Sequence, residues 1–76
     1  MAMFERIKDI LSGDMQIDET IITPEAELVG DLGLNSLELA DLVLSCEDKF
    51  GVEISDSDIH TLITVGDIVS YVETKM

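Results

Sequence analysis

The residue best placed to do chemistry is Ser36, which opens the longest helix that the sequence predicts. Asn35 before it is a favoured N-cap residue, because its side-chain oxygen accepts a free backbone N–H. Glu38 follows three residues later and completes a capping box, while Leu34 and Leu39 are spaced to form a hydrophobic staple. With Asn35 as the cap, the Ser36 hydroxyl is free at the positive end of the helix dipole. An anion attached there, such as a phosphodiester, is favoured.

Taken alone, a serine at a helix start is usually no more than a second capping residue. The residues around Ser36 indicate a more specific role. The run Asp31-Leu32-Gly33-Leu34-Asn35-Ser36-Leu37-Glu38 resembles the attachment motif of acyl carrier proteins, whose usual core is Asp-Ser-Leu. The resemblance extends from Phe4 to Val72 in length, acidity and order of elements. It implies that Ser36 carries a 4′-phosphopantetheine arm. The chain departs from the family pattern at Asn35, where Asp is usual.

The remaining reactive side chains do not predict an active site. His60 is the single histidine, and we expect it on the surface of a short helix. A triad of Ser36, His60 and an aspartate would need an enclosed, preorganised site, which so small a core hardly supplies. Cys46 falls on a core-facing stripe and is expected to be a small buried apolar residue. We therefore predict that the protein is not an enzyme.

No specific metal site is predicted either. Asp56 and Asp58 begin like a calcium loop, but Thr61 stands where an EF-hand requires glycine. The lone cysteine excludes an internal disulfide and a cysteine cluster. Only loose binding of Mg²⁺ or Ca²⁺ by acids such as Glu47 and Asp48 stays open.

The charge of the chain restricts its partners. Four basic and seventeen acidic residues give a formal charge of −13 over 76 residues, which we interpret as a single domain, residues 1–76. Nucleic acids and anionic membranes are polyanions, so the charge disfavours both and favours partners with basic patches. Acidity also simply aids solubility, and that alternative stays open. No secretory signal or membrane-spanning segment is visible, so we expect a cytoplasmic monomer without membrane insertion.

Apolar spacing predicts a first helix from Met3 to Ser12, with Gly13 as its stop. The connection from Asp14 to Leu34 is long for a structureless segment, so we expect it to pack on the core. Thr23-Pro24-Glu25 within it predicts a short turn of helix. The apolar residues expected to hold the connection down are Ile17, Ile21, Ile22, Leu28 and Leu32.

The second helix is predicted from Ser36 to Phe50, with Gly51 as its stop, and it carries two apolar stripes. The wide stripe, expected in the core, consists of Leu39, Leu42, Val43, Cys46 and Phe50. A narrow stripe consists of Leu37, Ala40 and Leu44. The narrow stripe either contacts another helix or the long loop, or it forms a docking surface with acids at its rim. The family resemblance favours docking and implies a partner surface of Asn35, Leu37, Glu38, Ala40, Asp41, Leu44, Glu47 and Asp48.

The last third of the chain predicts two more helices. Val52-Glu53-Ile54 is expected to be an extended link, followed by a short helix from Ser55 or Asp56 to about Leu62. Thr64 and Asp67 predict a cap for the last helix. Its core face is Val65, Ile68, Val69 and Val72. The predicted fold class is all-α: a small four-helix bundle with a long first loop and a short third helix.

The residues alone indicate a non-enzymatic carrier or adaptor. The resemblance implies that a phosphopantetheinyl transferase attaches the arm from coenzyme A. The thiol of the arm would then hold acyl groups as thioesters for acyl-processing enzymes of fatty acid biosynthesis. A carrier of polyketide or aminoacyl units, and an acidic interaction module without a prosthetic group, are the alternatives. Whether an acyl chain enters the flexible aliphatic core or stays in solvent is open.

Overall fold

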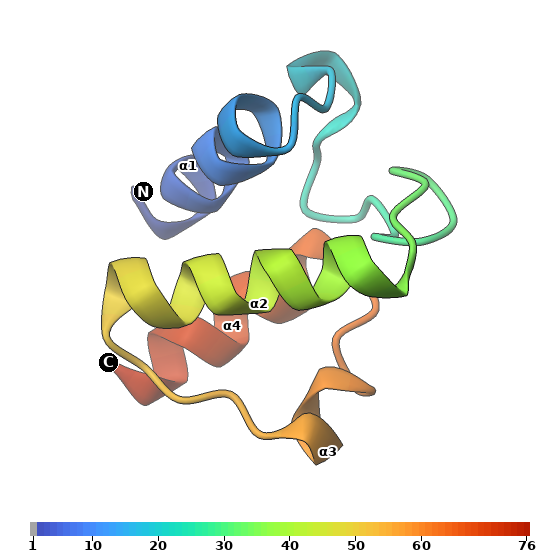
Figure 1. The fold of residues 1–76 in the computed structure, drawn as a ribbon. Helices are drawn as coiled ribbons and strands as arrows, with labels where there is room; N and C mark the ends of the chain where they lie inside the picture. Colours follow the sequence, from blue (N-terminus) through green and yellow to red (C-terminus); the bar gives the residue numbers. More distant parts are fainter. Residues whose placement is uncertain (1) are drawn as a thin grey trace.

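The computed structural model describes residues 2–76, with side chains from residue 3 onward, and it confirms the all-α four-helix fold (Figure 1). The helices are α1 (Ala2–Asp9), α2 (Ser36–Phe50), α3 (Asp56–Ile59) and α4 (Val65–Lys75). A π-helical turn, η1 (Ile10–Asp14), continues α1, and a 3-10 turn, η2 (Glu19–Ile21), lies in the long first loop. Among the described residues, no helix is long and apolar enough to cross a membrane.

The end of the first helix differs from the sequence prediction. The chain does not stop at Gly13 but continues through η1, in which the Met15 N–H donates to the Ile10 carbonyl at 3.2 Å. This wider turn lets Ile10 and its neighbour Leu11 both enter the core. The residue that turns the chain in the left-handed region is Gln16, with φ 57°. A tertiary gain in burial therefore overrides the glycine stop signal.

The first loop, residues 15–35, packs on the core largely as predicted. Ile22 and Leu28 are buried, and Ile17 and Leu32 are half-buried, whereas Ile21 is exposed, contrary to the prediction. The short helical turn lies at η2, where the Asp18 carboxylate accepts the Thr20 N–H at 2.9 Å. It does not lie at Thr23-Pro24-Glu25, which forms a plain turn closed by the Ala26 N–H and the Thr23 carbonyl.

Long-range backbone pairing holds the first loop against the start of α4. The Leu28 N–H donates to the Ile63 carbonyl at 2.9 Å, and the Val65 N–H donates to the Ala26 carbonyl at 3.0 Å. The Gly66 N–H donates to the Pro24 carbonyl at 2.8 Å, and a Cβ at Gly66 would lie 3.0 Å from that oxygen. Glycine therefore permits the loop to lie close against the start of α4.

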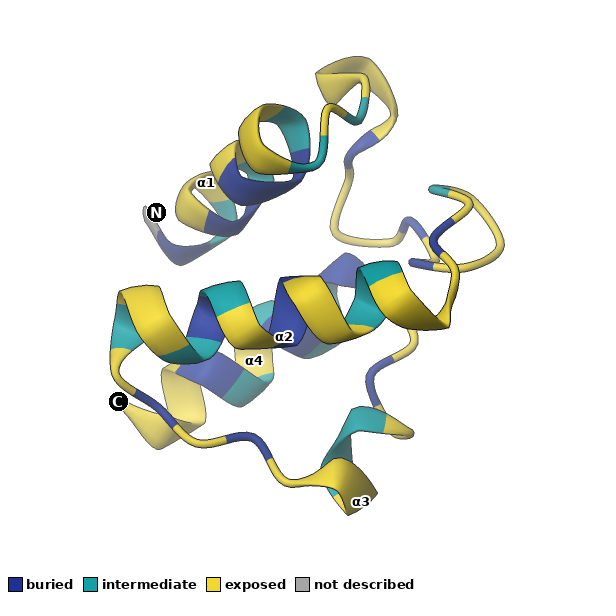
Figure 2. Ribbon diagram, viewed as in Figure 1, coloured by how far each residue is buried: buried dark blue, intermediate teal, exposed yellow. Residues whose placement is uncertain are grey.

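Helix α2 has the predicted bounds and the predicted core face. Figure 2 shows the buried positions of the helices turned toward the middle of the molecule. Gly51 ends the helix in the left-handed conformation, with φ 66°, as predicted. Of the wide stripe, Leu42, Val43 and Cys46 are buried, and Leu39 and Phe50 are half-buried against the same core.

The last third confirms the extended link and corrects the length of the third helix. Val52 and Ile54 are buried and no strand forms there. Ser55 caps α3, which ends at Ile59 rather than near Leu62; tight turns follow, in which the Thr61 N–H donates to the Asp58 carbonyl and the Leu62 N–H donates to the Ile59 carbonyl. In α4 the capping box of Thr64 and Asp67 is present, and the core face is Val65, Ile68 and Val72, with Val69 half-buried.

Candidate functional site

The start of α2 has the capping geometry that the sequence predicts. The Asn35 side-chain oxygen accepts the Glu38 N–H at 2.8 Å, and the Glu38 carboxylate accepts the Asn35 N–H at 3.0 Å. Gly33, with φ 74°, and buried Leu34 bring the chain into this cap, and Leu34 and Leu39 join the same apolar core. Because Asn35 fills the cap, Ser36 is the first helical residue and is exposed.

The electrostatics at this helix start favour an anion on Ser36. The backbone N–H groups of the first turn and the dipole of a 15-residue helix present partial positive charge there. Two acids close to Ser36 in the sequence have structural roles, since Glu38 belongs to the capping box and the Asp31 carboxylate accepts the Glu27 N–H at 2.7 Å. A phosphodiester on the Ser36 oxygen would therefore meet N–H donors at its base.

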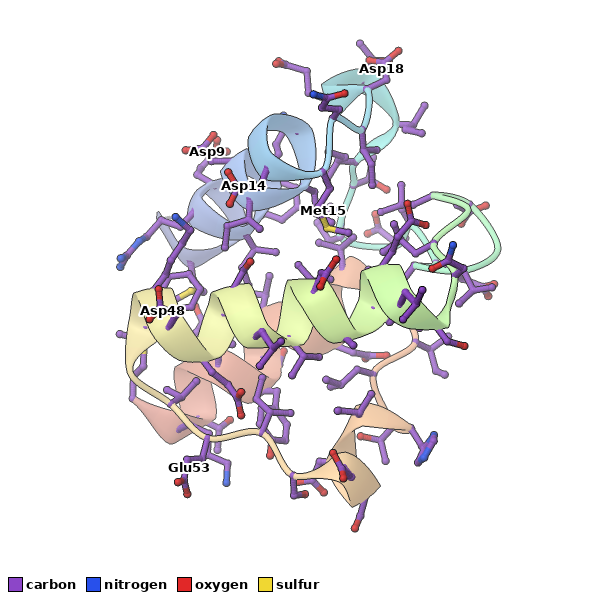
Figure 3. All side chains as sticks on the ribbon, viewed as in Figure 1. Asp9, Asp14, Met15, Asp18, Asp48 and Glu53 are labelled. Carbon is purple, nitrogen blue, oxygen red and sulfur yellow. The ribbon has the colours of Figure 1, made fainter. Side chains whose placement is uncertain are left out.

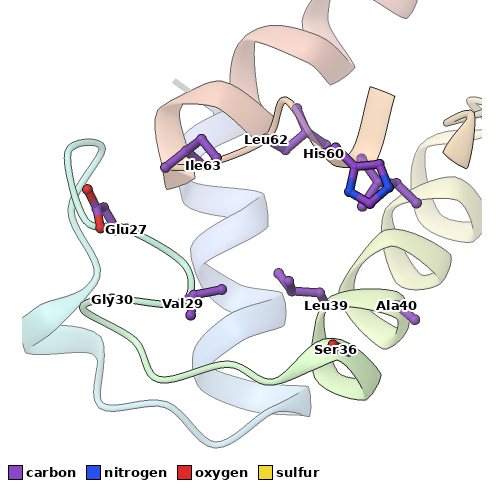
Figure 4. Close-up of a pocket in the computed structure, with 10 residues that line it drawn as sticks. Glu27, Val29, Gly30, Ser36, Leu39, Ala40, His60, Leu62 and Ile63 are labelled. Atoms are coloured by element: carbon purple, nitrogen blue, oxygen red, sulfur yellow. The ribbon is translucent and has the colours of Figure 1, made fainter. Parts of the chain in front are cut away.

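A pocket of about 370 Å³ lies beside Ser36 (Figure 4). Three parts of the chain line this pocket, which we call the arm pocket. The first loop contributes Glu27, Val29 and Gly30, and α2 contributes Ser36, Leu39 and Ala40. The third part is α3 with the residues after it, which contributes Ile59, His60, Leu62 and Ile63. Most of this lining is aliphatic, so the pocket suits an apolar or amphipathic chain.

The narrow stripe on α2 faces solvent and not another helix. Leu37 is 78% exposed, Leu44 is 61% exposed, and Ala40 between them is also exposed. This excludes the alternative that the stripe only contacts a neighbouring helix or the first loop. Asn35, Asp41 and Asp48 are exposed as well, and Figure 3 shows Asp48 on the outer surface near the end of α2.

Glu47 makes a structural contact that the sequence did not predict. It is half-buried, and its carboxylate accepts the Ile54 N–H at 2.8 Å. This hydrogen bond ties α2 to the extended link before α3. Glu38 is likewise half-buried and occupied by the cap. Of the predicted acidic rim, Asp41 and Asp48 are the exposed members.

The other predicted reactive residues have clear placements. Cys46 is a free, buried thiol, and burial raises its pKa to about 11. Asp58 accepts the Tyr71 hydroxyl at 2.5 Å, and this bond, with the Ser55 hydroxyl, lowers the pKa of the Asp58 carboxyl. His60 is exposed, as predicted, at the end of α3. Among the described residues, no group of three or more His, Cys, Asp or Glu side chains could hold a metal ion.

The sequence analysis did not single out four residues of the arm pocket: Glu27, Val29, Gly30 and Ile63. Of these, Val29 in the first loop and Ile63 before α4 are the large apolar ones, 59% and 53% exposed. The sequence signal that could have identified them is a large apolar residue at a loop position, where no helical repeat requires one. The walls meet only through the pairing of the loop with residues 63–66, which periodicity within one segment does not reveal.

Comparison with known proteins, like the geometry of the helix start, indicates a site for attaching a prosthetic group. A family model described as "Phosphopantetheine attachment site" matches residues 5–72. An acyl carrier protein of Thermotoga maritima is 47% identical over 74 residues, covering 97% of this chain and 91% of that protein. Acyl carrier proteins of Helicobacter pylori strains 26695 and G27 are 45% and 44% identical over 73 residues, each covering 96% of this chain and 94% of the relative. The exposed hydroxyl at a capped helix start and the aliphatic pocket beside it suit such an arm. This chain belongs to the acyl carrier protein family.

Proposed function

We propose that this protein carries acyl groups on a 4′-phosphopantetheine arm attached to Ser36, in fatty acid biosynthesis. One observation carries the proposal: the Asn35 capping box leaves an exposed Ser36 at the first turn of α2, beside an aliphatic pocket. When bound, the arm supplies a thiol that holds an acyl group as a thioester. The chain itself supplies attachment, orientation and docking rather than catalysis.

Attachment uses the Ser36 hydroxyl as the nucleophile and a separate transferase as the catalyst. The serine oxygen forms a new bond to the phosphorus that bears the pantetheine in coenzyme A. The pyrophosphate bond breaks, adenosine 3′,5′-bisphosphate leaves, and the serine proton passes to a base of the transferase. The exposure of Ser36 admits a large enzyme, and the N–H groups of the first turn favour the phosphodiester that results.

Docking involves the same helix. The exposed stripe of Leu37, Ala40 and Leu44, with Asp41 and Asp48 near it, matches a partner with an apolar patch and basic residues around it. The flexible arm then raises the effective concentration of the cargo at the docked enzyme. We further propose a monomer that works in the reducing cytoplasm, where the buried thiol of Cys46 stays free.

The arm pocket supports partial burial of the cargo. Its walls are aliphatic side chains from three separate segments, which can part around a linear chain. Longer saturated acyl chains should therefore stabilise the fold progressively, by at most roughly 0.8 kcal/mol for each buried CH₂. Thermal unfolding of a series of acylated forms measures this. Stability that does not change with chain length would indicate a chain in solvent.

Intact-mass measurement tests the attachment. Wild-type protein, Ser36→Ala and the matched control Ser70→Ala, whose serine is exposed on α4, are incubated with coenzyme A and a phosphopantetheinyl transferase. Wild type and Ser70→Ala should gain the mass of one arm. Ser36→Ala should gain none while keeping its helical circular dichroism, because Asn35 still caps α2.

Two results would contradict the proposal. Modification of Ser36→Ala would place the arm on another residue. No mass gain in any form would indicate the alternative of an interaction module without a prosthetic group. Loading the modified protein with acyl and aminoacyl donors then separates a fatty-acid carrier from carriers of other cargo.

A further inference from the structure

His60 is the side chain of the arm pocket that is able to carry positive charge. It lies just after α3, on the wall that faces Ser36 and the start of α2 across the pocket (Figure 4). The pocket has one other ionisable lining residue, Glu27, which comes from the first loop on the opposite side. The two walls are therefore electrostatically different: one is anionic, and the other offers an imidazole.

The other cationic side chains of the described chain are placed elsewhere. Arg6 stacks on the Phe50 ring at 4.7 Å, and Lys49 lies 4.0 Å from the Asp14 carboxylate. Lys8 lies over Phe4 and Lys75 over Tyr71, at 6.0 and 5.2 Å from the ring centres. None of these four residues lines the arm pocket. Among the described residues, His60 is thus the basic side chain that lines the pocket beside Ser36.

We infer that His60 is a positioning residue for the prosthetic arm. Its imidazole donates a hydrogen bond to an acceptor oxygen of the arm and holds the arm along the α3 wall. The arm has acceptors of two kinds, the phosphodiester and the amide carbonyls, and an imidazole N–H suits either. Glu27 contributes by repelling the phosphodiester from the loop wall. This inference rests on the proposed attachment at Ser36.

The groups around His60 leave its ring free for this contact. On α3, Asp56 is exposed at the far end of the helix, and the Asp58 carboxylate is occupied by the Tyr71 hydroxyl. From α2, the pocket residues are Ser36, Leu39 and Ala40, none of which is charged. From the first loop, Glu27 is the charged pocket residue. The His60 side chain is exposed at the pocket and accessible to the arm.

Isotope-filtered NMR of the modified protein tests the inference. The protein is labelled with ¹³C and ¹⁵N, the arm is unlabelled, and intact mass first confirms that the arm is attached. We expect nuclear Overhauser contacts between the ring protons of His60 and protons of the arm. In His60→Leu, which removes the donor, the arm resonances should move toward those of free pantetheine. His60→Gln keeps a donor and should restore part of the shift.

A matched double variant tests whether the position of the imidazole matters, because it keeps the amino-acid composition of the chain unchanged. His60→Thr with Thr61→His moves the imidazole by one residue, to an exposed site outside the arm pocket. It should behave like His60→Leu. A change of the ³¹P shift in His60→Leu assigns the contact to the phosphodiester. In a second sample, with a ¹³C-labelled arm on unlabelled protein, a change of the arm carbonyl ¹³C shifts assigns it to an amide. An attached arm with no contacts to His60 and resonances unchanged in His60→Leu would overturn the inference while leaving the attachment intact.

Discussion

Asn35 combines a structural role with a chemical departure from its family. Its side-chain oxygen closes the capping box at 2.8 Å, so the cap functions without the negative charge of the usual Asp. Asn and Asp are nearly equal as caps. The charge itself would lie on the exposed surface next to Ser36, where a basic residue of a transferase can pair with it. Stability and modification therefore depend on different properties of this residue.

Exchanging Asn35 for Asp should separate these two properties. Asn35→Asp should change the free energy of unfolding by no more than about 0.5 kcal/mol. It should also raise the efficiency with which a general transferase modifies Ser36, since charge-assisted hydrogen bonds are about twice as strong as neutral ones. Denaturant titration and initial rates of mass gain measure the two effects. Equal or slower modification would mean that Asn35 is neutral or matched to a dedicated transferase.

Asn35→Ala serves as the control. Removing the cap should destabilise the protein by about 1 kcal/mol, because the Glu38 N–H loses its acceptor. If Asn35→Ala and Asn35→Asp were equally stable, the capping box would contribute less than its geometry indicates.

Cys46 should be unreactive in the folded protein. Burial raises the pKa of its thiol from 9.0 to about 11, so the folded protein has about a hundredfold less thiolate at neutral pH than an exposed cysteine. Alkylation should be slow under native conditions and fast in denaturant. Because the folded pKa is the higher one, the thiol's contribution to stability is complete below pH 9 and is lost as pH rises toward about 11. Rapid native alkylation at pH 8 would contradict this picture.

At the scale of elements, the exposed face of α2 determines docking. Replacing Asp41 and Asp48 by Lys should slow association with a partner enzyme, and added salt should do the same to the wild type. Leu44→Ala should instead speed dissociation, because Leu44 is an exposed apolar anchor. Surface plasmon resonance with an immobilised transferase or acyl-processing enzyme measures both rates.

Glu53→Lys is the matched control for the charge reversals. Glu53 is exposed on the extended link that follows α2 and does not belong to the helix itself (Figure 3). A reversal there should have a smaller effect on association. If both reversals slowed docking equally, the partner would respond to total charge and not to the face of α2. Glu47 is unsuitable for this test, because its carboxylate holds the Ile54 N–H.

The elements that could be predicted are those specified by nearby residues. The two capping boxes, at Asn35 and Thr64, each involve residues three positions apart, and both formed as expected. The features that were not predicted are those whose structure depends on contacts with segments far away in the sequence. The contact of Glu47 with Ile54 was not predicted, because the path of Ile54 past this helix is a tertiary feature. Pro24 was assigned to a helical turn because its pairing with Gly66 is invisible in the local sequence.

The site could be predicted in part for the same reason. Ser36 is defined by its immediate neighbours, so capping rules and a motif were enough to find it. The arm pocket is not local, since Val29, Leu39 and Ile63 reach it from three segments that only the fold brings together.

At the scale of the whole molecule, the compact fold holds many acidic side chains close together, so that they repel one another. The radius of gyration is 11.0 Å, close to the roughly 11 Å expected for a compact chain of this length. The charge of −13 is spread over this small volume, and Asp9, Asp14, Asp18, Asp48 and Glu53 project outward in Figure 3. Within the described residues the one close ion pair is Lys49 with Asp14, at 4.0 Å and well exposed, so it compensates little.

This repulsion should make stability sensitive to ions. Added NaCl or millimolar Mg²⁺ should raise the melting temperature by screening or binding the acids. Neutralising two exposed acids, as in Asp9→Asn with Glu53→Gln, should raise the melting temperature at low salt and reduce its salt dependence. Differential scanning calorimetry across a salt series measures this. A melting temperature independent of salt in both proteins would show that the acids are spaced widely enough not to interact.

The pairing of the first loop with the start of α4 also has a consequence for the order of events during synthesis. The pairing in which the Leu28 N–H donates to the Ile63 carbonyl forms only when the segment before α4 has left the ribosome. A nascent chain that ends at Phe50 contains Ser36 and its cap but cannot close the pocket or bury the apolar faces of α2. We expect a transferase to modify ribosome-bound chains of that length poorly and released chains fully, so the arm would be added as a post-translational step that reports on completed folding.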